Sequence, residues 1–169
     1  VSRANLDGSD IEEIIIGCVL PSGLRQGPAR QAAIDAGIPV ESGATTINKL
    51  CGSGMKATML AHDLIKAGTN EIMVSGGMES MSNAPYLLPK ARVGLRMGHQ
   101  EIQDSMFTDG LEDAKTGRLM GSFAQDMADK YQTVSYTHLR SHATKANSAC
   151  RPLLEKKTEC KILVQTACH

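Results

Sequence analysis

Cys51 is the residue of this 169-residue chain whose type and setting best suit covalent chemistry. It lies in the stretch N-K-L-C-G-S-G-M-K-A (48–57), between the end of an expected strand and the start of an expected helix. The N–H groups and the dipole of a helix start favour a thiolate over a thiol, while Gly52 and Gly54 would allow a sharp turn and leave room for a substrate. This setting predicts an exposed nucleophile that can form a thioester. A small buried side chain is the ordinary alternative for a single cysteine.

The same stretch allows a second interpretation without covalent chemistry. G-S-G-M-K-A (52–57) fits the glycine-rich loop of dinucleotide-binding folds, which predicts a non-catalytic module that binds CoA or a nucleotide. Such a loop needs an acidic residue at the end of the next strand, about 20 residues later, to hold a ribose. Glu71 has the spacing but begins the next strand, and Glu79 follows that strand but lies 27 residues from Gly52. The fit is therefore poor.

The elements that must position Cys51 alternate between strands and helices. In chain order the patterns predict strand 14–20, helix 28–37, strand 44–48, helix 53–67 and strand 71–75. The first strand is continuously apolar and rich in isoleucine, which is typical of a strand buried on both faces. Gly76 and Gly77 are expected to end the last strand. Strands joined through helices predict an α/β fold with a mainly parallel sheet covered by helices.

The pattern becomes irregular between residues 78 and 120, where one short helix is expected around 105–114. A connection of this length usually serves function. Ser122 and Gln125 have the spacing of a capping box and predict the start of another helix.

The chain changes character near residue 132. All sixteen glycines lie at or before Gly121, and residues 133–169 carry a net charge of +4 against −4 for the residues before them. This last stretch has no sustained hydrophobic period, so we expect it to be unstructured or artefactual.

Composition disfavours several classes of function. The zero net charge, three Tyr, two Phe and no Trp argue against nucleic-acid binding. No apolar run is long enough to cross a membrane, and the first ten residues lack the apolar core of a signal peptide, which predicts a cytoplasmic protein. The five cysteines have neither C-x-x-C spacing nor a paired framework, which disfavours a metal site and structural disulfides.

Two motifs together carry a resemblance to a known family. N-K-L-C-G-S-G-M-K-A (48–57) and V-S-G-G-M-E-S-M-S-N-A-P-Y (74–86) closely resemble the thiolases, specifically the acetyl-CoA acetyltransferases. Matching stretches also occur at 17–23, 28–33, 108–114 and 119–126. The resemblance implies the N-terminal half of a thiolase-like αβαβα layered fold, with a truncated N-terminal domain over 1–132 and the start of a loop domain at about 78–121. Residues 133–169 do not match the family.

The resemblance also implies an activity. Cys51 would accept an acyl group from acyl-CoA, with its own backbone N–H helping to hold the thioester oxygen. A second acetyl-CoA, deprotonated at its methyl carbon, would attack the thioester to give acetoacetyl-CoA, and the reverse reaction is thiolysis of a 3-ketoacyl-CoA. CoA thioesters would be substrates, with no separate cofactor. A place in fatty acid metabolism and a homodimer or homotetramer would follow.

Three further residues gain roles from the resemblance. Met120 would line a narrow acyl pocket, and Met78 would lie near the site and a subunit contact. Leu119 stands where many biosynthetic members carry a histidine, so it bears on the acyl-chain preference. His99 matches no catalytic histidine of the family. His62 lies one position off the apolar stripe of the expected helix, which predicts a partly buried or surface side chain, and Ser53 lacks the frame of a serine nucleophile.

The family completes its site with three elements from a C-terminal half: an Asn-Glu-Ala-Phe segment, a Gly-His-Pro histidine and a Cys-x-Gly-Gly-Gly base. None of these occurs in this sequence. We therefore expect the chain as written to be inactive in turnover, although Cys51 itself can be reactive.

Overall fold

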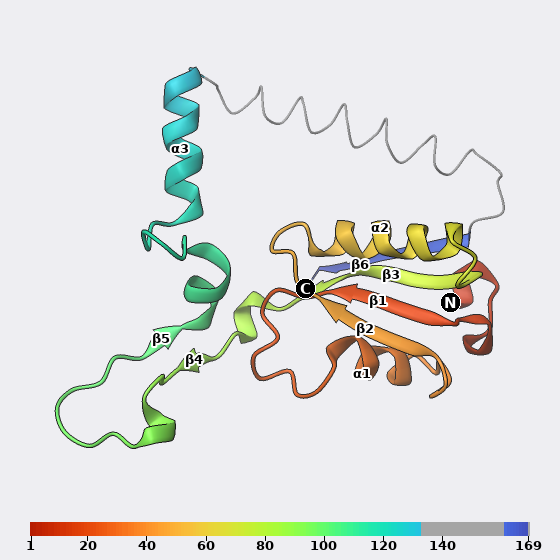
Figure 1. Ribbon diagram of the computed structural model, residues 1–169, viewed down its shortest axis with the longest axis horizontal. Coiled ribbons are helices and arrows are strands. Elements are labelled where there is room, and N and C mark those ends of the chain that lie inside the picture. Colours follow the sequence, from red (N-terminus) through yellow and green to blue (C-terminus); the bar gives the residue numbers. More distant parts are fainter. Residues whose placement is uncertain (133–160, 169) are drawn as a thin grey trace. The chain divides into compact units, whose positions relative to one another are not determined.

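The computed structural model describes residues 1–132 and 161–168 and divides into two compact units (Figure 1). The first unit holds Val1–Gly110 together with Cys160–His169, and the second holds Leu111–Glu159. The first unit contains the sheet and Cys51, so it is the part that positions the candidate nucleophile.

The first unit is built on a four-stranded sheet in the order β2-β1-β3-β6. The strands are β1 (Glu13–Gly17), β2 (Gly43–Ile47), β3 (Ile72–Glu79) and β6 (Lys161–Cys168), and every neighbouring pair is parallel. Helices α1 (Pro28–Asp35) and α2 (Ser53–Lys66) cover opposite faces of the sheet (Figure 1). The predicted α/β fold with a parallel sheet and covering helices is confirmed.

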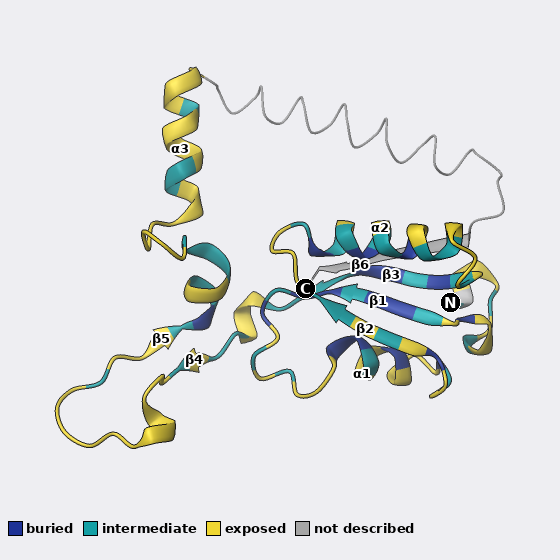
Figure 2. Cartoon of the chain, in the orientation of Figure 1, coloured by how far each residue is buried: buried dark blue, intermediate teal, exposed yellow. Residues whose placement is uncertain are grey.

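Strand β1 is buried on both faces, as its apolar run predicts. Ile14 packs with Ala33 of α1 in one core cluster, and Ile15 packs with Ala57 and Ala61 of α2 in another. Buried residues of β1 therefore lie between the two helices (Figure 2). Because alternate residues of a strand point to opposite faces, the single isoleucine run supplies both halves of the core.

The start of α2 packs directly on the sheet at glycines. A Cβ added to Gly17 would lie 2.6 Å from the Gly54 nitrogen, and one added to Gly54 would lie 3.4 Å from the Gly77 nitrogen. This contact explains why β3 continues through Gly76 and Gly77 to Glu79, whereas the sequence analysis ended the strand before them. These glycines leave room for a helix and do not break the strand.

The remainder of the described chain consists of short elements and one helix. Strands β4 (Tyr86–Leu87) and β5 (Gln103–Asp104) form an antiparallel pair, and a π-helical turn spans Phe107–Leu111, within the expected helix 105–114. Single 3₁₀ turns lie at Ser2–Ala4, Gly8–Asp10, Met81–Asn83 and Ala91–Val93. No helix among the residues described here is both long and apolar enough to cross a membrane.

Helix α3 (Met120–Tyr131), in the second unit, begins earlier than the expected capping box. Leu119 is its N-cap residue, so Ser122 already lies in the first turn and donates a hydrogen bond from Oγ to the Leu119 carbonyl at 2.7 Å. Gln125 donates to Asp129 instead of closing a box. The predicted helix exists, but the predicted capping box was wrong because the helix had already started.

Strand β6 differs from the expectation that 133–169 is without regular structure. Lys161–Cys168 pairs in parallel with β3, from Ile72↔Lys161 to Glu79↔Cys168. Its sequence, K-I-L-V-Q-T-A-C, contains a short apolar run, and the edge of β3 offers backbone groups to pair with. Residues 133–160 lie outside the described residues.

Candidate functional site

Cys51 lies in the five-residue join 48–52 between β2 and α2, at the carboxyl edge of the sheet. The register aligns Ile47 with Gly17 and Gly17 with Gly77, so β1, β2 and β3 reach this edge together. Cys51 is exposed. Ligands of open α/β sheets bind beyond the carboxyl ends of the strands, so the thiol has the position that the sequence analysis predicted.

The join that carries Cys51 has an unusual backbone conformation. Leu50 has φ +48°, in the left-handed region, which costs a residue with a Cβ about 1–2 kcal/mol. Asn48 Oδ1 accepts the Leu50 N–H at 2.9 Å. Ser53 Oγ accepts the Lys49 N–H at 2.8 Å and donates to the Leu50 carbonyl at 2.6 Å. Each such bond contributes about 1 kcal/mol, so together they offset the cost.

The loop after β1 is tied to the same region by Asn48 and Glu79. Asn48 Nδ2 donates to the Val19 carbonyl at 3.2 Å. The Glu79 carboxylate accepts the N–H of Val19 at 2.8 Å and that of Leu20 at 3.0 Å. The sequence patterns gave no role to Asn48 and pointed to Glu79 only as a ribose ligand. The Asx-turn tendency of Asn was a usable signal for the Leu50 bond, whereas the partners of Glu79 lie about sixty residues away.

These contacts weaken the nucleotide-binding interpretation. Both carboxylate oxygens of Glu79 are already bonded to backbone N–H groups. Glu71 precedes β3, at the opposite edge of the sheet from the glycine-rich loop. Among the residues that the structure describes, neither acid considered from the sequence is placed to hold a ribose.

The two glycines that follow Cys51 do not act as the sequence analysis expected. Gly52 has φ −94°, which any residue adopts, and Gly54 is needed for packing against Gly77. The residue in the left-handed region is Leu50. The expectation that these glycines create the sharp turn was therefore wrong. The turn is held by the side-chain bonds of Asn48 and Ser53 and by backbone bonds from the Gly52 N–H to the Lys49 carbonyl and from the Ser53 N–H to the Leu50 carbonyl.

Replacing Gly52 with alanine should accordingly change little. A Cβ there would lie 3.5 Å from the Lys49 carbonyl oxygen, an ordinary contact. We expect the free energy of unfolding of Gly52→Ala to differ from that of the unaltered chain by less than about 1 kcal/mol, as alanine is only a weaker N-cap residue. Urea denaturation measures this. A loss of several kcal/mol would show that the position needs glycine.

The remaining predicted site residues occupy different units. Met78 is half-buried at the end of β3, on the same sheet edge as the Cys51 join. Leu119 and Met120 lie in the second unit at the start of α3, with exposed fractions of 44% and 45%. Their part in an acyl pocket stays a prediction.

The polar residues set aside in the sequence analysis have ordinary settings. His62 is exposed on α2, with Nδ1 3.2 Å from Asp63 Oδ1, and His99 is exposed in the loop before β5. Ser53 is only 4% exposed, and its hydroxyl is used within the join. Within residues 1–132, no group of three or more His, Cys, Asp or Glu residues is arranged to hold a metal ion.

Cys18 contrasts with Cys51, because it is buried beside Glu79. Its Sγ lies 3.7 Å from Glu79 Oε1. Burial, and after it the negative charge of Glu79, raise the pKa of the Cys18 thiol above its ordinary value of 9.0. The folded chain therefore holds this proton more tightly than the unfolded chain does.

This difference predicts a loss of stability in alkali. The stability that the protonated Cys18 thiol contributes is fully present below 9.0, the pKa of this thiol in the unfolded chain. It is lost as the pH rises from there through the higher pKa of the thiol in the folded chain. Urea denaturation at about pH 8 and about pH 10 measures the fall. Cys18→Ala should show a smaller fall, and an equal fall in both chains would contradict the assignment to Cys18.

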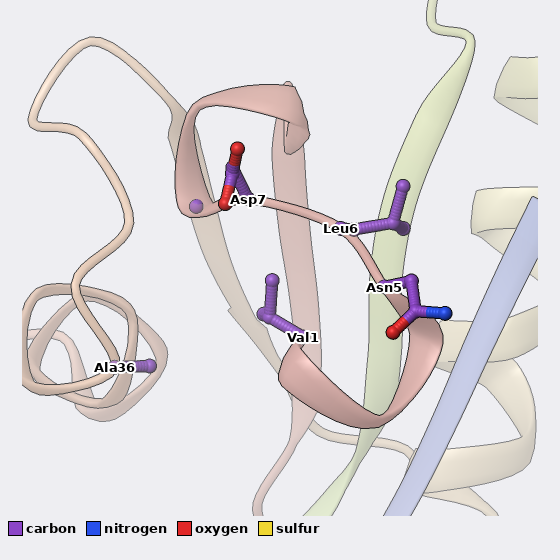
Figure 3. Close-up of a pocket in the computed structure, with 6 residues that line it drawn as sticks. Val1, Asn5, Leu6, Asp7 and Ala36 are labelled. Atoms are coloured by element: carbon purple, nitrogen blue, oxygen red, sulfur yellow. The ribbon is translucent and has the colours of Figure 1, made fainter.

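A pocket of about 670 Å³ lies at the opposite edge of the sheet. It is lined by Val1, Asn5, Leu6, Asp7, Gly8 and Ala36 (Figure 3). These residues precede β1 or follow α1, so they lie at the amino ends of the parallel strands. The pocket is therefore separate from the Cys51 edge.

Comparisons with known proteins agree on one family. The profile described as "Thiolase, N-terminal domain" matches residues 1–149. The acetyl-CoA acetyltransferase of Pseudomonas aeruginosa is 50% identical over 131 residues, and acetyl-CoA acetyltransferase 2 of Arabidopsis thaliana is 49% identical over 132 residues. Each alignment covers 78% of this chain and 33% of the relative, so the chain spans about a third of the length of these relatives.

Solved structures show the same likeness. The Acat5 thiolase from Ascaris suum in complex with coenzyme A matches with a TM-score of 0.75 and 35% identity, over 95% of this chain and 42% of that one. The Bacillus anthracis acetyl-CoA acetyltransferase matches with a TM-score of 0.74 and 35% identity, over 79% of this chain and 34% of that one. Fold, motifs and relatives together establish that this chain belongs to the thiolase family and corresponds to its N-terminal domain.

Proposed function

We propose that Cys51 is the nucleophile of a thiolase-type acetyl-CoA C-acetyltransferase. Its thiolate attacks the carbonyl carbon of acyl-CoA, the bond from that carbon to the CoA sulfur breaks, and CoA leaves as a thiol after taking up a proton. The observation that carries the proposal is the exposed sulfur at the start of α2, on the carboxyl edge of a parallel sheet. The coenzyme A complex of the Ascaris suum thiolase supports acyl-CoA as the substrate.

The backbone around Cys51 supplies the polar part of this step. The negative charge that develops on the thioester oxygen needs N–H donors fixed in advance. In the proposal the Cys51 N–H is one of them, and the hydrogen bonds of Asn48 and Ser53 fix the backbone that presents it. Met78 borders the same edge, while Leu119 and Met120 would shape the acyl pocket.

The second half-reaction needs groups that this sequence does not contain. A carbanion formed from the methyl group of a second acetyl-CoA would attack the acyl-enzyme to give acetoacetyl-CoA and free Cys51; thiolysis is the reverse. The Gly-His-Pro histidine, which in the family activates the nucleophile, and the Cys-x-Gly-Gly-Gly base are both missing from the sequence. We propose that the chain accepts an acyl group without completing turnover.

Thiolysis measures this limit directly. Incubating the chain with acetoacetyl-CoA and CoA should yield no more than about one acetyl-CoA per chain above the uncatalysed reaction, because the sequence contains neither the Gly-His-Pro nor the Cys-x-Gly-Gly-Gly element needed for repeated turnover. The Pseudomonas aeruginosa relative, assayed beside it, is the positive control. Turnover comparable to that of the relative would refute the limit and leave the nucleophile assignment intact.

Three broader proposals depend on the family. A role in fatty acid metabolism is proposed for the complete enzyme, and acyl-CoA chemistry supports it. A homodimer or homotetramer is proposed for the complete enzyme, and a cytoplasmic location is proposed from the composition. Size-exclusion chromatography with light scattering of a full-length relative, compared with this chain, tests the oligomeric state.

A further inference from the structure

The join that carries Cys51 is fixed at three backbone groups by only two side chains. Asn48 accepts the Leu50 N–H, and Ser53 bonds both the Lys49 N–H and the Leu50 carbonyl. Leu50, the residue before the nucleophile, is in the left-handed region, and its own side chain is 59% exposed. Packing of the leucine therefore does not hold this conformation.

Asn48 also connects this join to the loop after β1. Its Nδ2 donates to the Val19 carbonyl, while the N–H groups of Val19 and Leu20 are held by Glu79 at the end of β3. Asn48 and Glu79 together thus connect the ends of β1, β2 and β3 to the backbone next to Cys51. The contacts span segments that are about thirty and sixty residues apart in the chain.

We propose that Asn48 is a positioning residue for the Cys51 nucleophile. It holds Leu50 in the left-handed conformation and thereby directs the Cys51 thiol outward at the start of α2. Glu79 supports Asn48 because it accepts the Leu20 N–H and so fixes the peptide group whose Val19 carbonyl accepts the hydrogen bond from Asn48 Nδ2. The catalytic part of this inference rests on the proposed acyl transfer, whereas the positioning part concerns the thiol itself.

Substitutions at position 48 can separate the effects of the two hydrogen bonds that Asn48 makes. Asn48→Ala removes both bonds. Asn48→Ser keeps a short-range oxygen that can accept the Leu50 N–H, as serine does in turns, but it cannot reach Val19. Leu50→Asn supplies a residue that tolerates the left-handed region better than leucine, so it should compensate for the missing Asn48 bond.

The experiment uses the full chain and follows the peptide containing Cys51 by mass spectrometry. Two rates are measured: acetylation by acetyl-CoA and alkylation by iodoacetamide. We expect Asn48→Ala to slow acetylation by about tenfold and alkylation by about threefold, because the left-handed conformation loses its support. Asn48→Ser should be intermediate, and Leu50→Asn in the Asn48→Ala chain should restore at least half of the lost acetylation rate.

Gln31→Ala is the matched control, because Gln31 also donates its side-chain amide to loop carbonyls, those of Leu24 and Gln26, but does so from α1. It should leave both rates unchanged. Thermal unfolding of every variant shows whether each remains folded. Because Leu50→Asn also relieves backbone strain, both rates are compared at a temperature at which thermal unfolding shows every variant fully folded, so that a restored rate reports positioning and not refolding.

Two outcomes would overturn the inference. Asn48→Ala could react at the rate of the unaltered chain, or Leu50→Asn could fail to restore any of the lost rate. A different result would overturn the proposed function instead: Cys51 of the unaltered chain is alkylated but never acetylated. In that case the alkylation rates still decide whether Asn48 positions the thiol.

Discussion

Replacing Cys51 with alanine should abolish acetylation of the chain by acetyl-CoA. The sulfur is the atom that takes the acetyl group in the proposed reaction, and Cys18, the other cysteine whose side chain the structure describes, is buried. Cys51→Ser keeps nearly the same shape, but its hydroxyl is not ionised near neutral pH. Acetylation of Cys51→Ser should therefore be slower than that of the unaltered chain by a factor of about a hundred or more. Radiolabelled acetyl-CoA measures both losses.

The control for this prediction is a chain that keeps Cys51 and lacks the buried thiol. Cys18→Ala removes a side chain that is 1% exposed, so acetylation per folded molecule should equal that of the unaltered chain. The central proposal fails if Cys51→Ala is acetylated as fast as the unaltered chain. It also fails if the label is lost only in Cys18→Ala.

Replacing Gly17 with alanine should give the largest loss of stability of any change considered. The added Cβ would lie 2.6 Å from both the Gly54 nitrogen and the Ser53 Cβ. β1 is paired on both sides by β2 and β3, so neither it nor the start of α2 can move freely. We expect a decrease of about 3 kcal/mol in the free energy of unfolding, measured by urea denaturation. The displaced helix start should also slow Cys51 acetylation.

Gly121→Ala provides the matched control. Gly121 lies in α3, and a Cβ there would meet no atom within 4 Å. Because alanine favours a helix over glycine, this change should raise stability slightly, by up to about 1 kcal/mol. If Gly17→Ala proved as stable as Gly121→Ala, the close packing of α2 on β1 would be wrong.

The main elements of the fold could be predicted because each has its own local pattern. The isoleucine run in β1 indicated burial on two faces, and Pro28 marked the start of α1. The contact of Gly17 and Gly77 with α2 could not be predicted, because it depends on which strands pair. For the same reason Gly76 and Gly77 resembled the end of a strand although β3 continues through them.

The candidate site, too, could be predicted from the sequence only where its parts are neighbours in the chain. The position of Cys51 followed from a strand, a glycine pair and a helix that are adjacent in the sequence. The support around it did not, because Glu79 and Asn48 meet at the Val19 backbone only after the sheet has formed. Strand β6 was missed because its apolar run is short and its pairing with the edge of β3 depends on which strands meet in the sheet.

Mass spectrometry of the folded chain after incubation with acetyl-CoA tests the central claim most directly. Peptides containing Cys51 and Cys18 are compared in the same sample, so the buried thiol controls for unfolding. The proposed mechanism predicts one acetyl group on Cys51 and none on Cys18, with release of CoA in equal amount. An unmodified Cys51 in a folded chain whose Cys51 still reacts with iodoacetamide would contradict it.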